Sequence, residues 1–359
     1  MKIQVWRQDL KLRYPWAVAG RGGSLGKTLA EQVFIRLEDP DSLYGWGEGA
    51  PPVRYQETAG TIQDFLSRID GSKLFFGDLE ASARYLDSLA PGNQAAKAAV
   101  NLALLDGAAR SHCQTAHAFC GLGFEENRYL TCYSIGIDTP ERIRQKVADA
   151  QDYPVLKIKF GGADDSATLA AVREVAWAKP VRVDANESWK TPAEALKKIE
   201  WLATDGRIEF VEQPMPSQAS PRDLQWLKER SPLPVFADES YHREEDLSLC
   251  RDCFHGVNVK LVKTGGLLAA RQALIAARAA GLQTMLGCMI ESSLLISAAG
   301  HLAALTDYLD LDGNLLITND PFLGLSCTNG LLSLRGAPEA YGLQVAPRPG
   351  FLSTARLVS

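Results

Sequence analysis

The chain has 359 residues, of which 46% are hydrophobic and 23% charged, an ordinary composition for a folded globular protein. Its formal net charge is −5 and its basic residues are scattered, which argues against a general nucleic-acid-binding protein. The sequence contains no long uncharged apolar run and no signal-peptide core, so we expect no membrane span and a cytoplasmic location. Seven unevenly spaced cysteines fit reduced thiols better than a disulfide framework.

Residues 1–125 predict an α+β domain. Three segments alternate as strands do, which indicates a small antiparallel sheet: 2–6, 30–38 and 43–49. From about residue 57 to residue 120, apolar residues recur with the period of helices. The glycine-rich segment 20–28 misses the phosphate-loop pattern by one position, because Arg21 stands where the first glycine is required. We therefore expect no nucleotide site there.

Residues 126–318 alternate between short apolar runs and helical segments. The eight runs are 129–137, 154–160, 181–186, 208–214, 234–240, 256–261, 283–290 and 308–314. Such alternation gives parallel strands joined by crossover helices. The pattern predicts an α/β fold with a (β/α)8-type barrel. An open doubly wound sheet is the alternative, but its usual glycine-rich turn after the first strand is missing from the sequence. We expect residues 319–359 to return to the first domain or to cover the barrel.

Charged residues stand at the carboxyl ends of seven of the eight predicted strands. In chain order these strand-end residues are Lys157 and Lys159, Asp184, Glu212, Asp238 and Glu239, Lys260, Glu291, and Asp310 and Asp312. In a barrel these ends meet at one face, and that face carries the active site. Salt bridging around the rim without chemistry is the structural alternative.

Asp184, Glu212 and Asp238 lie on three consecutive predicted strands, so we expect their carboxylates to converge. Converging carboxylates repel one another unless a cation lies among them. An all-oxygen ligand set favours Mg²⁺ or Mn²⁺ over zinc. We expect one Mg²⁺ ion per subunit, with Mn²⁺ as the alternative.

Lys159 and Lys260 flank this trio from the two neighbouring strands. Asn258 and Lys260 share a strand face, so we choose Lys260 rather than Lys263 as the inward residue. Lys157, on the same face as Lys159, should lower the pKa of Lys159 and help it act as a base. A metal would stabilise the enediolate formed when a carboxylate loses its α-proton. Lysines on opposite sides of that carbon predict racemisation or epimerisation.

The segments LKIKF, VDANESW, VEQP, ADES, NVKLVKTGG and MIES together strongly resemble the enolase superfamily. The likeness is to its muconate lactonising enzyme subgroup and covers nearly the whole chain. It implies that residues 1–125 are an α+β capping domain, that residues 126–318 form a modified TIM barrel of the (β/α)7β type, and that residues 319–359 return to the capping domain. The resemblance implies that Asp184, Glu212 and Asp238 bind Mg²⁺, and that Lys159 and Lys260 are the acid/base catalysts. The residues it implies in supporting roles are Lys157, Asn186 and Glu239.

The subgroup contains several activities that share these core residues, so the core residues cannot distinguish them. The residues of the last predicted strand can help to do so. Asp310 and Asp312 share a strand face and can bind a cationic ammonium group. Dipeptide epimerases carry such a D-x-D pair. The resemblance thus implies a Mg²⁺-dependent dipeptide epimerase, acting at the α-carbon of the C-terminal residue of L-Ala-D/L-Glu or another dipeptide. The alternative activities are those of an N-acylamino acid racemase or an o-succinylbenzoate synthase. The alternative for the D-x-D pair itself is a plain structural turn at Asp312.

The same resemblance places the loop of residues 20–28 over the active site. Arg21, Lys27 or Arg54 could then bind an acidic substrate side chain, although each fits plain loop structure equally well. The other substrate contacts that we expect are Ser134, Lys157, Met289 and Glu291. We expect a small dipeptide as ligand, neither nucleic acid nor membrane as partner, and a homo-oligomer.

Overall fold

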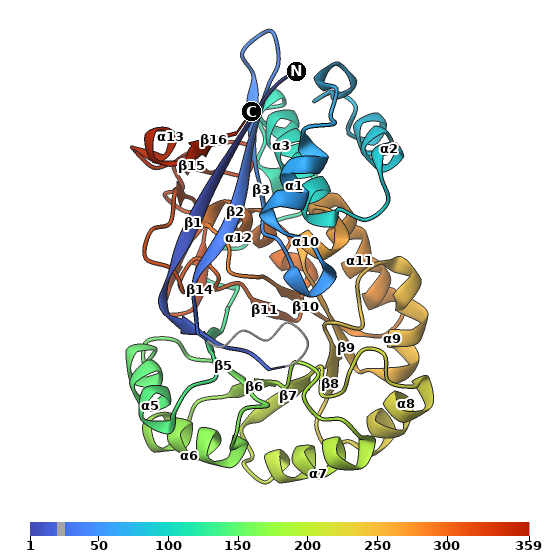
Figure 1. Cartoon of the computed structure of the whole chain (residues 1–359), viewed down its shortest axis with the longest axis vertical. Coiled ribbons are helices and arrows are strands. Elements are labelled where there is room, and N and C mark those ends of the chain that lie inside the picture. Colours follow the sequence, from blue (N-terminus) through green and yellow to red (C-terminus); the bar gives the residue numbers. More distant parts are fainter. Residues whose placement is uncertain (20–25, 359) are drawn as a thin grey trace.

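The computed structural model describes residues 1–19 and 26–358, so Arg21 lies outside the described residues. The expected antiparallel sheet is present, with strand order β16-β1-β2-β3 (Figure 1). Its strands are β1 (Lys2–Trp16), β2 (Lys27–Glu38), β3 (Tyr44–Gly49) and the C-terminal β16 (Arg356–Leu357). β1 and β2 are longer than the alternation predicted and extend down to the barrel (Figure 1).

Helices cover one side of this sheet. They are η1 (Val53–Tyr55), α1 (Ala59–Leu66), η2 (Gly71–Lys73), α2 (Leu79–Leu89), α3 (Gln94–Ser111) and α4 (Ala116–Phe119). The alanine-rich α3 packs directly on β3, where glycines allow backbone contact. A Cβ atom added to Gly47 would lie 1.9 Å from the carbonyl oxygen of Ala99, and one added to Gly45 would lie 2.0 Å from that of Ala103. We call this sheet with its helices the cap.

The eight predicted strands of the barrel are all present. They are β4 (Tyr133–Ile135), β5 (Leu156–Lys159), β6 (Val181–Asp184), β7 (Ile208–Glu212), β8 (Val235–Ala237), β9 (Gly256–Val259), β10 (Gln283–Gly287) and β11 (Tyr308–Asp310). They pair in parallel in chain order. A bridge from Thr131 to Leu309 brings the two edges together, so the barrel is nearly closed. The fold class predicted from the sequence is confirmed.

Helices surround the barrel strands (Figure 1). They are α5 (Pro140–Asp149), α6 (Asp165–Ala176), α7 (Pro192–Ala203), α8 (Pro221–Arg230), η3 (Glu244–Asp246), α9 (Leu247–Cys253), α10 (Leu261–Thr264), α11 (Leu267–Ala279), α12 (Ser293–Gly300) and η4 (Ala303–Leu305). The starts of α5, α6, α7, α8 and α12 follow local capping rules. In α7 the Thr191 side chain accepts a hydrogen bond from the Glu194 N–H, and Pro192 occupies the first turn. Among the described residues, no helix is long and apolar enough to cross a bilayer.

The chain after the barrel returns to the cap. It forms β12 (Phe322–Leu323), β13 (Ser326–Thr328), β14 (Leu331–Ser333), β15 (Ala346–Pro347) and α13 (Phe351–Thr354) before β16. β16 pairs antiparallel with β1, and the ring of Phe351 packs against those of Trp6, Phe34 and Trp46.

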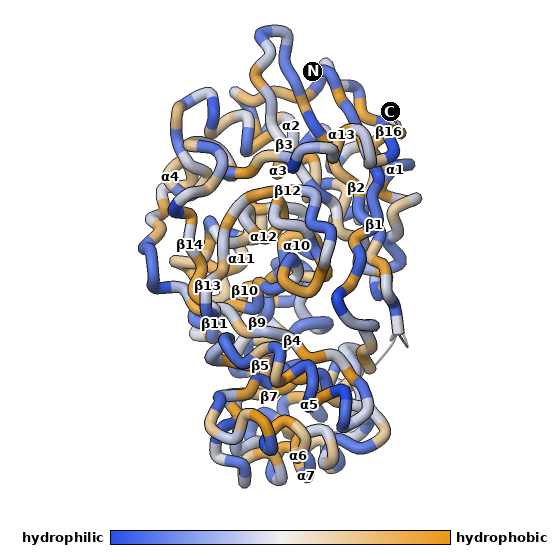
Figure 2. The backbone as a smooth tube through the Cα atoms, turned by 90° about the vertical axis from the view of Figure 1, so that its left-hand side faces the viewer, coloured by the Kyte–Doolittle hydropathy of each residue, from blue (hydrophilic) through white to orange (hydrophobic). Residues whose placement is uncertain are grey.

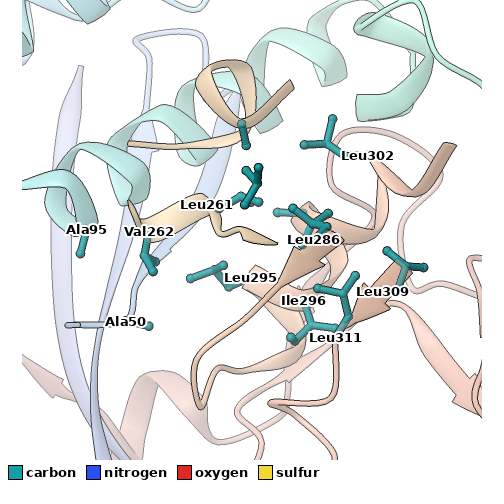
Figure 3. Packing of buried hydrophobic residues seen from close by; sticks show 14 of the residues in the cluster. Ala50, Ala95, Leu261, Val262, Leu286, Leu295, Ile296, Leu302, Leu309 and Leu311 are labelled. Atoms are coloured by element: carbon teal, nitrogen blue, oxygen red, sulfur yellow. The ribbon is translucent and has the colours of Figure 1, made fainter. Parts of the chain in front are cut away.

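One buried apolar core runs through both the cap and the barrel. Figure 3 shows Ala50 and Ala95 of the cap near Leu261 and Val262 of α10, with Leu295 of α12 close by. Figure 2 shows orange, hydrophobic segments of the tube where the cap meets the barrel, around the labels α10 and α12. A smaller cluster of Phe210, Phe236 and Met285 fills the barrel interior. The cap therefore shares its core with the barrel and is fixed on it by apolar packing.

The contact between β3 and α3 should make Gly47 intolerant of any side chain. We expect Gly47→Ala to lower the free energy of unfolding by about 3 kcal/mol or more, because backbone has to move to admit the methyl group. Gly77→Ala is the matched control, since no heavy atom lies within 4 Å of its added Cβ. Denaturant unfolding of the two variants checks this, and equal midpoints would contradict the packing described.

Candidate active site

Three buried carboxylates meet at the carboxyl ends of adjacent barrel strands. Asp184 ends β6, Glu212 ends β7 and pairs with it in register, and Asp238 directly follows β8. One oxygen from each lies within 4.8 Å of the others. The relative exposures of Asp184, Glu212 and Asp238 are 0%, 0% and 4%. We call these residues the carboxylate trio.

The trio concentrates negative charge in a place that water does not reach. Burial and the neighbouring Asp184 raise the pKa of Glu212 to about 7. Burial also opposes ionisation of Asp238, but Lys260 and Lys263 hold its pKa well below the usual range. Glu239, beside the trio, has its pKa raised to about 8 by burial and then by Asp238 and Asp184. Within the described residues its Oε2 is buried without a hydrogen-bond partner. Such a set of crowded oxygen donors fits a hard divalent cation.

Lysines surround the trio. Lys159 Nζ donates to Asp184 Oδ2 at 2.6 Å, and Lys260 Nζ donates to Asp238 Oδ2 at 2.9 Å. These two ammonium groups therefore lie at opposite ends of the trio. Lys157 Nζ lies 2.7 Å from Glu212 Oε2, in the middle. Burial disfavours the charge on Lys157, but Asp310 and Glu212 hold its pKa well above the usual range, so it is an ammonium ion.

Sequence reasoning chose Lys260 over Lys263, whereas the structure brings both to Asp238. Lys263 lies on the short helix α10, and its Nζ donates to Asp238 Oδ1 at 2.7 Å and to the Asn258 carbonyl at 3.0 Å. Its side chain is fully buried behind Asp238, whereas Lys260 lines the cavity. The spacing of Lys263 could have indicated this contact. Lys263 follows Lys260 by three residues, which in a helix is nearly one turn and places the two side chains on one face.

A second layer of side chains orients the trio. The backbone N–H of Asn186 donates to Asp184 Oδ1 at 2.9 Å, and its Nδ2 donates to Glu239 Oε1 at 3.2 Å. Gln213 Oε1 accepts the backbone N–H groups of Asp238 at 2.9 Å and Ser240 at 3.1 Å. The loops that follow β6, β7 and β8 are thus bonded to one another as well as to the carboxylates.

Asp310 and Asp312 reach the same region from β11. Asp310 forms an ion pair with Lys157, which holds its pKa down to about 2 against the effect of burial. Asp312 Oδ2 accepts the backbone N–H of Ser134 at 2.6 Å, and burial with the charge of Asp310 raises its pKa to about 7. Cys132 Sγ also donates to Asp310 at 3.2 Å, a contact that the sequence did not suggest.

A cavity of about 700 Å³ between the cap and the barrel mouth exposes many of these groups. The predicted site residues that line it are Lys27, Arg54, Ser134, Lys159, Asn186, Asp238, Glu239, Lys260, Met289, Asp310 and Asp312. Glu291 is 1% exposed, and its Oε1 accepts the backbone N–H of Met289, so it supports the segment that carries Met289. The guanidinium of Arg54 is bound by Glu187.

Comparisons with known proteins agree with this geometry. A family model described as Enolase C-terminal domain-like matches residues 140–349. An L-Ala-D/L-amino acid epimerase from Pedosphaera parvula is 54% identical over 345 residues, which cover 96% of this chain and 99% of the relative.

Solved structures show the same overall fold. The substrate-liganded L-Ala-D/L-Glu epimerase from Bacillus subtilis superposes with a TM-score of 0.88 at 28% identity, covering 97% of this chain and 98% of that one. A dipeptide epimerase from Cytophaga hutchinsonii, complexed with Mg and D-Ala-L-Val, gives a TM-score of 0.90 at 25% identity, covering 99% and 98%.

The trio should account for divalent metal binding. We expect Glu212→Gln to weaken Mn²⁺ binding at least about 100-fold, because the central anionic ligand is lost. Glu209→Gln is the control, since Glu209 lies on the same strand but pairs with Arg182. Calorimetric titration with Mn²⁺ checks this. Equal affinities of the two variants would mean that the ion binds elsewhere.

Proposed function

The chain belongs to the enolase C-terminal domain-like family, and from that premise we propose that it is a metal-dependent dipeptide epimerase. Relatives and solved neighbours named as dipeptide epimerases support the assignment. The observation that carries it is the placement of Lys159 and Lys260 at opposite ends of the carboxylate trio, with Asp310 and Asp312 in the same cavity. A dipeptide offers a carboxylate at one end and an ammonium group at the other, which matches this distribution of charge.

Lys159 and Lys260 are the proposed acid/base catalysts. With the substrate α-carbon between them, one amine removes the α-proton and the other ammonium returns a proton to the opposite side. This sequence inverts the stereocentre, and it can run in either direction because each lysine can take either role. The carboxylates of Asp238 and Glu212 raise the pKa of Lys260, and a cation among them would weaken that effect and favour the neutral amine.

We propose that the trio binds a single Mg²⁺ ion, with Mn²⁺ as a possible replacement, in keeping with the Mg in the neighbouring dipeptide complex. When bound, the metal would stabilise the negative charge that develops on the substrate carboxylate. Lys157 carries a fixed positive charge between Asp310 and Glu212, and its ion pairs with both carboxylates would help to position the trio.

Asp310 and Asp312 are proposed to bind the free ammonium group of the dipeptide, with Ser134 holding Asp312 in place. The cap residues at the cavity would select the substrate side chain. Arg54 is already engaged by Glu187, so we assign the binding of an acidic side chain to Lys27, which lines the cavity, or to Arg21.

The choice between dipeptides and N-acylated amino acids can be tested directly. In D₂O with Mg²⁺, we expect members of a dipeptide library to gain one deuterium, whereas N-succinyl amino acids do not, because only the former supply the cation that Asp310 and Asp312 require. Mass spectrometry reads the exchange. Deuterium in the N-succinyl compounds alone would replace the proposal by a racemase.

Separate stereochemical roles should appear when each lysine is removed. We expect Lys159→Ala and Lys260→Ala to lose epimerisation by at least about 1000-fold, while each still exchanges the α-proton of one stereoisomer, because one base remains. Lys198→Ala is the control, since Lys198 pairs with Asp165 away from the cavity. Proton exchange followed by NMR for both isomers checks this. Full epimerase activity in either catalytic variant would exclude the two-base assignment.

A further inference from the structure

An ion-paired junction ties the cap to two loops at the barrel mouth. We propose that Arg54, Glu187 and Ser217, here called the cap latch, form a positioning device that fixes the loop carrying Asn186 and thereby aligns Asp184 for the reaction. Arg54 is then a positioning residue and does not contact the substrate. The kinetic part of this inference rests on the proposed epimerase activity.

The geometry of the latch is bidentate and largely shielded from water. Arg54 Nε donates to Glu187 Oε2 at 2.8 Å, and Arg54 Nη2 donates to Glu187 Oε1 at 2.8 Å. The same Nη2 donates to Ser217 Oγ at 3.1 Å, and the Ser217 N–H donates to Glu187 Oε1 at 2.8 Å. The Arg54 and Glu187 side chains are 19% and 4% exposed. Two parallel hydrogen bonds between planar groups fix orientation as well as distance.

The latch holds a loop whose backbone needs support. Asn186 and Glu187 have φ angles of 42° and 64°, in the left-handed region that costs energy for residues other than glycine. The Glu187 N–H donates to the carbonyl of Gln213 at 2.9 Å, and the Glu187 carbonyl accepts from Lys190 Nζ at 2.9 Å. These bonds hold the backbone on the barrel side. Arg54 adds a constraint on the Glu187 side chain from the cap.

Asn186 connects the cap latch to the active site. Asn186 precedes Glu187 and bonds both to Asp184 Oδ1, through its backbone N–H, and to Glu239 Oε1, through its side chain. A small shift of this loop therefore moves one member of the carboxylate trio. Because the reacting groups have to be aligned closely, a displacement of about 1 Å can cost roughly 100-fold in rate.

The latch also orients the cap side of the cavity. Tyr55 follows Arg54 in η1, lines the cavity and lies edge-on against the ring of His242, in the loop after β8. The cap latch thus joins η1 to the loops after β6 and β7, and Tyr55 brings η1 onto the loop after β8. Since the apolar core already fixes the cap on the barrel, loss of the latch should loosen these loops without unfolding the protein.

The test compares two similar ion pairs in the metal-loaded, full-length enzyme. We expect Arg54→Met to lower kcat by about 10- to 100-fold with little change in KM, and Arg54→Lys to recover part of the loss. Arg173→Met is the matched control, because Arg173 binds Asp205 in the same bidentate way at 2.7 and 2.7 Å, with 16% and 11% exposure. We expect it to leave kcat unchanged.

Hydrogen exchange provides a readout that does not depend on the activity. We expect Arg54→Met and Glu187→Gln each to increase amide exchange in both segments 53–56 and 185–190, whereas Arg173→Met increases it in neither. Increased exchange in 53–56 alone, or a kcat equal to that of the control, would overturn the inference. A rise in KM confined to acidic dipeptides, at constant kcat, would also overturn it and make Arg54 a substrate-binding residue. If the wild-type enzyme epimerised no dipeptide, the proposed function would fail while the exchange data still tested the latch.

Discussion

The mutual neutralisation of buried charges at the barrel mouth is the interaction on which the site depends. An isolated carboxylate or ammonium group in this environment would lose several kcal/mol of solvation. Asp184, Glu212 and Asp238 can stay buried because Lys159, Lys157 and Lys260 lie against them. Burial, and after it the charge of Asp184, still raises the pKa of Glu212 to about 7. A divalent cation among the three carboxylates would favour their ionised forms, which makes the trio suited to such an ion.

Closure of the barrel extends this charge pairing to the last strand. Lys157 on β5, the second strand of the sheet, and Asp310 on β11, the last, are 153 residues apart, yet they form an ion pair because the sheet closes on itself. In an open sheet these two strands would lie near opposite edges. The same closure places Asp312 against the backbone of Ser134 on β4. The groups suited to the two ends of a dipeptide thus share one cavity.

Local patterns predicted the barrel well, since each strand is a short apolar run followed by turn residues, and its charged end marks the face of the site. The residues that local patterns missed act over long distances or from the next turn. Lys263 lies on the short helix α10, beyond the predicted strand run 256–261, and Cys132 meets Asp310 only through barrel closure. Arg54 is one of three residues that the sequence offers for an acidic substrate side chain, and its actual partner, Glu187, is 133 residues away. No local periodicity reveals such a pair.

The cap is held on the barrel by two kinds of contact with different physical consequences. Apolar packing around α10 and α12 is strong but has no preferred direction, so it brings the cap close without fixing the orientation of its loops. A bidentate ion pair such as that of Arg54 with Glu187 adds modest stability but strict direction. The proposed proton transfer between two lysines requires such orientation, because the substrate α-carbon has to face both amines. The stability of the cap on the barrel and the alignment of its loops therefore depend on separate contacts. A loop of the cap can change its substrate-facing residues while the ion pair keeps the carboxylate trio in place.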